Sequence, residues 1–341
     1  MLLVFVIALI GALLFSALSL PIPWLIGPIF SVLIAQFFIK DRLRWPAVLR
    51  NTGLVIVGVA IGQQFDFALF SDFKSLLFFM VIVNVLLFAF CLGIAWIIAK
   101  STGLTFKTAV AANVPGGLSQ LVLFAEEEGD VHLTAVTYFH IVRVLGVVLL
   151  IPFLVSGHVV GGASIPLTWD VWQVVLVILL AAIAVPLGRK LKLPVAHFLT
   201  PIIIVIGLKF FGIEAPTMPS DVLHIAQILI GAYIGLLLKP ETLRLPLKVL
   251  IGGVTSTVAM IILTYGTSLL IAKFLDLSFA TSFLSTAPGG LDQMGLLAAA
   301  VKADISVVTV FQLFRLLFIF LCILPIIKWV YRDRGETVQQ N

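Results

Sequence analysis

The segment NVPGGLSQ at residues 113–120 returns in altered form as TAPGGLDQ at residues 286–293, and this pair is the strongest indication of the fold. Proline lacks the backbone N–H that continues a helix, and two glycines release the backbone further. In hydrocarbon, a helix interrupted in this way is tolerated only where protein or a water-filled cavity satisfies the opened backbone. The pattern therefore predicts a broken or re-entrant membrane helix that the chain builds twice.

The number of residues that separates Pro115 from Pro288 also separates many other matching residues along the chain. We call this separation the repeat offset, and we call two residues related by it counterparts. Prolines and glycines, which fix backbone shape rather than side-chain chemistry, supply most of the matches. The pairs outside the two stretches are Pro21 and Pro194, Pro28 and Pro201, Gly58 and Gly231, Gly62 and Gly235, and Pro152 and Pro325. We predict a first membrane repeat at residues 1–160, a linker at 161–167, a second repeat at 168–334 and a polar tail at 335–341.

Composition places the chain among polytopic membrane proteins. Hydrophobic residues make up 61% of it and charged residues 11%, whereas a soluble domain carries roughly a quarter charged residues. Apolar stretches near the length of about 20 residues that a bilayer-spanning helix requires recur throughout. The clearest are residues 76–99, 131–156, 174–188, 249–272 and 305–327. We therefore expect an all-α polytopic membrane protein.

Basic residues indicate how the two repeats are inserted. Loop 39–50 carries Lys40, Arg42, Arg44 and Arg50, whereas its counterpart, 212–223, carries no basic residue. Elsewhere the second copy holds the excess, as at Arg189, Lys190 and Lys192. Loops rich in basic residues face the cytoplasm. Because the basic residues lie in non-equivalent loops of the two copies, we predict that the copies insert into the membrane in opposite directions. The basic residues behind the net charge of +5 lie in short loops beside apolar spans, where they set the membrane topology. No nucleic-acid partner is therefore expected.

Opposite insertion requires an odd number of crossings in each copy. We expect two inverted repeats of about five transmembrane helices, each with a re-entrant Pro-Gly-Gly segment, and both termini in the cytoplasm. If the interrupted segment crosses fully, each copy has six spans and the repeats are parallel. The charge distribution argues against that alternative.

The interrupted segments are the first candidate site. A helix that restarts after a break presents free N–H groups and a positive dipole end, which suit an anion or a carboxylate. The alternative is a plain kink that allows close helix packing. We expect both segments to line one substrate site, with the candidates Asn113, Pro115, Gly116, Gly117, Ser119, Gln120, Thr286, Pro288, Gly289, Gly290, Asp292 and Gln293.

The last span of each copy carries an arginine, as His140-Ile141-Val142-Arg143 and as Gln312-Leu313-Phe314-Arg315. An arginine at mid-span costs roughly 3 kcal/mol or more, so it must face protein, water or an anionic partner. The spacing of three puts each polar residue and its arginine on one helix face. Since arginine suits carboxylates, we add all four residues to the substrate-binding candidates. The alternative is an arginine tied to backbone carbonyls that locks helices together.

Two further side chains suggest ion chemistry. Asp292 stands beside the helix break where the first copy has Ser119, and it is the candidate site for a coupling ion, Na⁺ or H⁺. His132 and His140 lie on one predicted helix and could face one metal ion. Their counterparts are not histidines and no third ligand is evident, so no metal site and no cofactor are predicted.

With these residues identified, the chain resembles the AbrB-duplication membrane proteins of bacteria over nearly its whole length. The resemblance rests on the twin Pro-Gly-Gly-Leu-(Ser/Asp)-Gln segments, on Arg143 and Arg315, and on the paired prolines near residues 21–28 and 194–201. Some members carry an ammonia monooxygenase label or a regulator name, but this chain offers no copper or iron ligand set and no DNA-binding domain. The wider similarity is to inverted-repeat carriers such as citrate–sodium symporters, bile-acid symporters and auxin carriers, which is an analogy of fold.

The duplicated interrupted segments, together with this resemblance, favour a secondary transporter in the bacterial cytoplasmic (inner) membrane, rather than an enzyme. We expect it to carry a small anionic or zwitterionic solute by alternating access, with Na⁺, H⁺ and a second copy of the chain as further candidate partners. The alternatives are a membrane-bound metal monooxygenase and a membrane regulatory protein.

Overall fold

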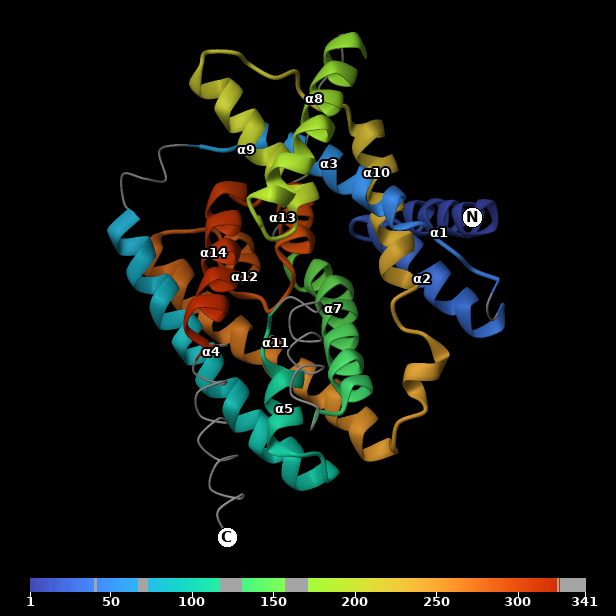
Figure 1. Ribbon diagram of the computed structural model, residues 1–341, viewed down its shortest axis with the longest axis vertical. Helices are drawn as coiled ribbons and strands as arrows, with labels where there is room; N and C mark the ends of the chain where they lie inside the picture. Colours follow the sequence, from blue (N-terminus) through green and yellow to red (C-terminus); the bar gives the residue numbers. More distant parts are fainter. Residues whose placement is uncertain (40–41, 67–72, 117–130, 157–170, 324, 326–341) are drawn as a thin grey trace.

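The computed structural model describes residues 1–39, 42–66, 73–116, 131–156, 171–323 and 325, and every regular element in these ranges is a helix. The first-copy helices are α1 (Leu2–Ala17), α2 (Pro23–Phe38), α3 (Ala47–Gln63), α4 (Phe73–Thr102), α5 (Phe106–Asn113) and α7 (Leu133–Ser156). The second-copy helices are α8 (Val171–Lys190), α9 (Ala196–Phe210), α10 (Ser220–Gly235), α11 (Leu247–Leu275), α12 (Phe279–Thr286), α13 (Leu291–Ala300) and α14 (Ile305–Phe318). The short helices η2 (Pro240–Leu243) and η3 (Ile319–Ile323) complete the set (Figure 1).

Five helical segments are long and apolar enough to cross a bilayer: Lys74–Thr102, Leu133–Val155, Val171–Lys190, Leu247–Leu275 and Ile305–Ile323. Large apolar side chains on them, such as Ile183 and Ile262, are exposed, as lipid-facing residues are. These findings confirm the all-helical class and indicate a multi-pass membrane protein. The other expected spans, α1, α2, α3, α9 and α10, have 15 to 17 residues, and are thus about 24 Å long, less than a hydrocarbon core of about 30 Å.

The elements of the two copies correspond at the repeat offset seen in the sequence. The first residues of α5 and α12 are counterparts, and so are the last. Each of these helices is capped by a hydroxyl side chain, since Thr105 accepts from the Thr108 N–H and Ser278 accepts from the Thr281 N–H. Ile22 and Val195, which precede α2 and α9, both have a left-handed backbone, with φ of 47° and 46°. Equivalent positions therefore share local geometry although their side chains differ.

The two copies also pack against each other through equivalent residues. At Gly58 of α3, an added Cβ would lie 2.6 Å from the Phe198 carbonyl oxygen of α9. At Gly231 of α10, the equivalent atom would lie 2.7 Å from the Leu25 carbonyl oxygen of α2. The two glycines are counterparts, and so are the two residues that supply the carbonyls. The third helix of each copy thus packs against the second helix of the other, at a distance that only glycine permits.

The long helices α4 and α11 are counterparts that lie side by side and run in opposite directions (Figure 1). Phe79, near the start of α4, stacks on Phe274, near the end of α11, with ring centroids 5.8 Å apart. Ile98, near the end of α4, approaches Gly252, near the start of α11. The α4 and α11 helices are therefore antiparallel.

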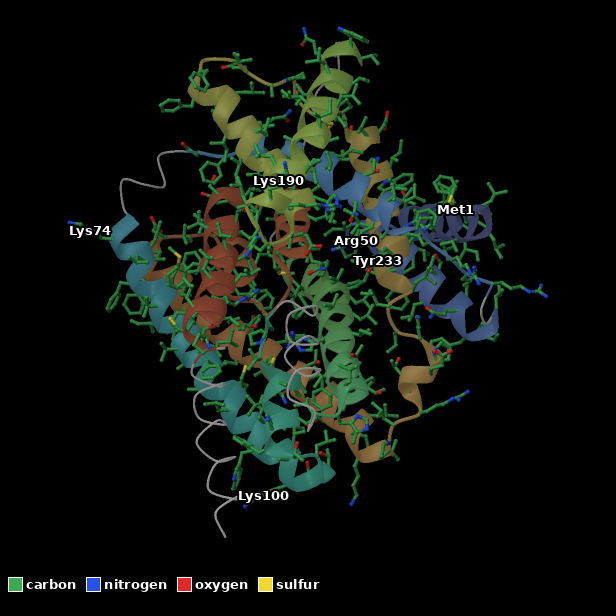
Figure 2. All side chains as sticks on the ribbon, in the orientation of Figure 1. Met1, Arg50, Lys74, Lys100, Lys190 and Tyr233 are labelled. Carbon is green, nitrogen blue, oxygen red and sulfur yellow. The ribbon has the colours of Figure 1, made fainter. Side chains whose placement is uncertain are left out.

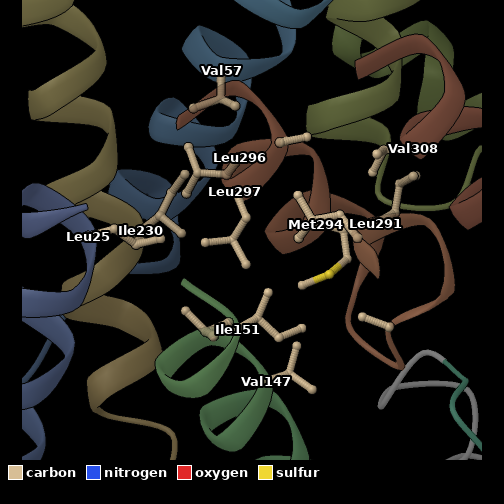
Figure 3. Packing of buried hydrophobic residues seen from close by; sticks show 14 of the residues in the cluster. Leu25, Val57, Val147, Ile151, Ile230, Leu291, Met294, Leu296, Leu297 and Val308 are labelled. Carbon is tan, nitrogen blue, oxygen red and sulfur yellow. The ribbon is translucent and has the colours of Figure 1, made fainter. Parts of the chain in front are cut away.

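The principal buried cluster joins the early helices to the interrupted segment of the second copy (Figure 3). Leu25, Val57 and Ile230 come from α2, α3 and α10. They share the cluster with residues of α7, α13 and α14, which are Val147, Ile151, Leu291, Met294, Leu296, Leu297 and Val308. This packing sets the position of the broken helix relative to the rest of the molecule.

Several helix boundaries differ from those expected. α3 begins at Ala47, after Pro46, so Arg50, counted above as the last residue of the loop 39–50, lies within the helix. Proline fixes φ at about −65°, and Pro46 supplies the extended N-cap residue of α3. The last span of the second copy continues from α14 into a π-helix at Ile319–Ile323. The predicted linker and polar tail lie outside the described residues.

Candidate functional site

The break in the second copy separates α12, which ends at Thr286, from α13, which begins at Leu291. The carbonyl groups at the end of α12 have no following helical N–H groups to bond. Two side chains of α14 take their place. Gln312 Nε2 donates to the Leu284 carbonyl at 2.6 Å, and Arg315 Nη1 donates to the Ala287 carbonyl at 2.5 Å. Arg315 Nη2 also donates to the Gly289 carbonyl.

The first copy repeats this arrangement at the end of α5. His140 Nε2 bonds the Ala111 carbonyl at 3.1 Å, and Arg143 Nη1 donates to the carbonyls of Asn113 and Val114 at 3.2 and 3.3 Å. Ala111 and Leu284, whose carbonyls accept these bonds, are counterparts. The side chains that bond them, His140 and Gln312, are one position closer in the sequence than the repeat offset. The last spans are thus shifted by one residue and still make equivalent bonds.

Each arginine is also held by the polar residue three positions before it. Arg143 Nη2 donates to His140 Nδ1 at 2.6 Å, and Arg315 Nη2 donates to Gln312 Oε1. Since His140 Nδ1 accepts, its Nε2 carries the hydrogen that is donated to Ala111. Both arginines are buried, with 5% of each residue exposed. The alternative considered from sequence, an arginine tied to backbone carbonyls, therefore describes part of what these side chains do.

A cavity of about 390 Å³ lies between the two capped breaks. Its wall includes backbone of both interrupted segments, at Pro115 and Gly116 and at Pro288, Gly289 and Gly290. Its polar side chains come from six helices and are Arg50, His140, Arg143, His197, Tyr233, Asp292, Gln293, Gln312 and Arg315. The cavity thus brings together residues from both copies.

Comparison with known proteins identifies the family. The profile described as transition state regulatory protein AbrB matches residues 24–331. The chain belongs to the AbrB family. A protein of Escherichia coli (strain K12) that carries the name AbrB is 26% identical over 316 residues, which cover 90% of this chain and 89% of that protein. The protein YhjN of Bacillus subtilis (strain 168) is 25% identical over 361 residues, which cover 96% and 92%.

Most of the residues predicted for the site line the cavity of this AbrB-family protein: Pro115, Gly116, His140, Arg143, Pro288, Gly289, Gly290, Asp292, Gln293, Gln312 and Arg315. Asn113 and Thr286 are buried behind it. Asn113 Nδ2 donates to the Ala109 carbonyl at 2.8 Å and its Oδ1 accepts from Ser256, while Thr286 donates to the Ser282 carbonyl at 3.1 Å. Gly117, Ser119 and Gln120 lie outside the described residues.

Arg50 lines the cavity although no sequence pattern had singled it out. Its Nη2 lies 3.2 Å from Asp292 Oδ2, and 28% of the Arg50 side chain and 7% of the Asp292 side chain are exposed. Its guanidinium carbon also lies 4.9 Å from the centre of the Tyr233 ring, and Figure 2 shows the two residues as neighbours. Because Arg50 was counted with the basic loop, its position one turn into α3 was overlooked.

Two buried polar atoms of the lining residues have no partner within the described part of the chain. They are Arg143 Nε and Gln293 Oε1. Gln293 Oε1 also lies close against the break, where a Cβ at Gly290 would overlap it. Buried polar atoms without partners carry a desolvation cost that a bound polar ligand can remove.

The histidines considered for a metal site have other roles. His132 Nδ1 accepts from the Ala135 N–H at 3.2 Å at the start of α7. His140 bonds Arg143 and Ala111, as described above. Across the described ranges, no three His, Cys, Asp or Glu residues are grouped to hold a metal ion.

Proposed function

We propose that this AbrB-family protein is a secondary transporter that carries a small anionic or zwitterionic solute across the bacterial cytoplasmic membrane by alternating access. The observation that carries the proposal is the cavity built from both Pro-Gly-Gly segments. Discontinuous helices that meet around one cavity are the usual construction of a substrate site in secondary transporters.

The charges in the cavity support an anionic group on the solute. The residues that line the cavity include three arginines, Arg50, Arg143 and Arg315, and one carboxylate residue, Asp292. The excess of positive charge lies among buried groups, where screening by water is weak. The volume of about 390 Å³ is near the lower end of ligand cavities, which suits a small solute.

We further propose that the copies are inverted repeats, each with an interrupted helix that re-enters. The antiparallel packing of α4 and α11 supports this arrangement. The basic residues also lie in non-equivalent loops of the two copies, and this supports the inverted arrangement independently. Both termini would then face the cytoplasm.

Alternating access would follow from movement of one group of helices against another. In this proposal the moving group comprises α5, α7, α12, α13 and α14, which carry the capped breaks. The scaffold comprises α2, α3, α9 and α10, which are held together by the close glycine contacts at Gly58 and Gly231. The cavity lies between these groups, so its accessible side would change as they move.

The test is a ligand screen followed by flux. Thermal unfolding of the purified full-length protein would be measured with small carboxylates, amino acids and amines, with and without Na⁺ and across pH. A compound that raises the unfolding temperature should be taken up by proteoliposomes of the wild type and of the exposed control Arg44→Gln, but not of Arg143→Ala. If no compound acts and the protein carries stoichiometric copper or iron, the carrier proposal fails in favour of the monooxygenase alternative.

A further inference from the structure

The ion pair between Arg50 and Asp292 joins the two groups of helices across the cavity. Arg50 belongs to α3 and Asp292 to the first turn of α13, 242 residues away. The Asp292 carboxylate is 7% exposed, so little water replaces Arg50 if the two separate. A buried charge that loses its partner is strongly destabilising, whereas exchange for another partner avoids that cost.

The three arginines of the cavity differ in how many donors they keep for a ligand. Arg143 and Arg315 use both terminal nitrogens on carbonyls and on the neighbouring His140 or Gln312. Within the described part of the chain, Arg50 makes one bond, from Nη2 to Asp292, and lies over the face of Tyr233. Among these three guanidiniums, that of Arg50 therefore keeps the most donors to hold an anionic group in the bidentate manner.

The pair has no equivalent in the other copy. The counterpart of Arg50 at the repeat offset is Leu223, and the counterpart of Asp292 is Ser119. These two residue types cannot form an ion pair. This ion pair is therefore present in one copy only, at the centre of a structure whose other contacts occur in equivalent pairs. Because the repeat does not require it, it points to a role in binding and not in folding.

We propose that Asp292 occupies the anion position of the site until solute binds, and that the carboxylate of the solute displaces it from Arg50. The freed Asp292 carboxylate then takes a cation, Na⁺ or H⁺, as its new partner. Anion and cation bind together because each alone would leave one member of the internal pair without a partner. This inference rests on the proposed transport function and adds how solute and coupling ion are linked.

The other charged and titratable groups that line the cavity come from four further helices. They are His140 and Arg143 of α7, His197 of α9, Tyr233 of α10 and Arg315 of α14. Arg143, Arg315 and His140 are fixed by the bonds to carbonyls described above. His197 Nε2 lies 2.7 Å from Arg189 Nη2, at the edge of the site. These groups are unchanged when Asp292 is replaced, so its removal tests the exchange directly.

The experiment measures thermal unfolding of the full-length protein against increasing acetate, succinate, phosphate or glutamate, as choline and as sodium salts at two pH values. The variants are Asp292→Asn, Arg50→Gln, the double variant and the exposed control Arg44→Gln. In choline salts the half-maximal anion concentration should be about tenfold lower for Asp292→Asn than for the wild type, equivalent to about 1.4 kcal/mol. Sodium or lower pH should bring the wild type towards Asp292→Asn and leave that variant unchanged.

Arg50→Gln should abolish the anion response with and without Asp292, while Arg44→Gln should match the wild type. Equal half-maximal anion concentrations for the wild type and Asp292→Asn would overturn the inference, and so would an anion response retained by Arg50→Gln. In either case, uptake of the same anion by proteoliposomes would leave the transport function standing. If none of the anions stabilises any variant and none is taken up, the proposed function fails together with the inference.

Discussion

Gly53 packs against the carbonyl oxygen of Ala226, which is its own counterpart at the repeat offset. This contact lies where α3 and α10 cross, so the two equivalent helices meet at equivalent positions. An added Cβ at Gly53 would lie 2.8 Å from that oxygen and 2.9 Å from Ile230 Cγ1. The crossing is therefore as close as a helix pair allows.

Gly53→Ala should destabilise the protein by about 1–3 kcal/mol, because the helices must separate to admit the methyl group. The measurement is the thermal unfolding midpoint in detergent. Gly93→Ala in α4 is the matched control, since a Cβ there meets nothing within 4 Å. That change should be neutral or slightly stabilising, as alanine is the better helix former. Equal effects of the two substitutions would contradict the close crossing.

Arg315→Lys should destabilise the protein by about 1–3 kcal/mol although the charge is kept, because a single ammonium group cannot reproduce the bonds of the guanidinium. Those bonds run to the carbonyls of Ala287 and Gly289 and to the Gln312 side chain. The unfolding midpoint measures the effect, with the exposed Arg44→Lys as control. A lysine variant as stable as the wild type would mean that charge alone is needed at this position.

His140→Gln should be tolerated, with a change below about 1 kcal/mol in the free energy of unfolding. Gln312 makes the same two bonds in the other copy, to an arginine and to the carbonyl equivalent to that of Ala111. His140→Leu removes both bonds in a buried place and should cost about 1–3 kcal/mol. If glutamine proves as damaging as leucine, the imidazole has a role beyond these hydrogen bonds.

Lys100 and Lys273 are equivalent, exposed positions near the ends of α4 and α11. Figure 2 shows Lys74 and Lys100 at opposite ends of α4. If the repeats are inverted, cysteines at 100 and 273 face opposite sides of the membrane. In a background without Cys91 and Cys322, a membrane-impermeant maleimide added to intact cells should label Lys273→Cys, and Lys100→Cys only after lysis. Labelling of both from outside would support parallel repeats.

The candidate site could be predicted where backbone chemistry determines it. Proline and glycine interrupt a helix whatever surrounds them, and an arginine in an apolar span needs partners. The breaks and Arg143 and Arg315 were identified for these reasons, and they lie together around one cavity. The equivalence of His140 and Gln312 was also visible, although their separation falls one position short of the repeat offset.

The residues that the sequence did not reveal come from helices that approach the cavity through packing. Arg50, His197 and Tyr233 belong to α3, α9 and α10, and no local pattern places these helices beside α13. Asn113 is a different case. It stands beside the break in the sequence, but its amide bonds Ala109 and Ser256 inside the protein and does not reach the cavity. Which side of a helix faces the cavity depends on its neighbours.

The crossing of Gly53 and Ala226 also bears on how such a chain can arise. If the two copies were separate chains, the same contacts would describe an antiparallel dimer of one half-length protein. On the axis of such a dimer a residue meets its own twin, and two large side chains cannot share that place. Gly53 and Ala226 are both small, as residues on the axis of such a dimer would have to be.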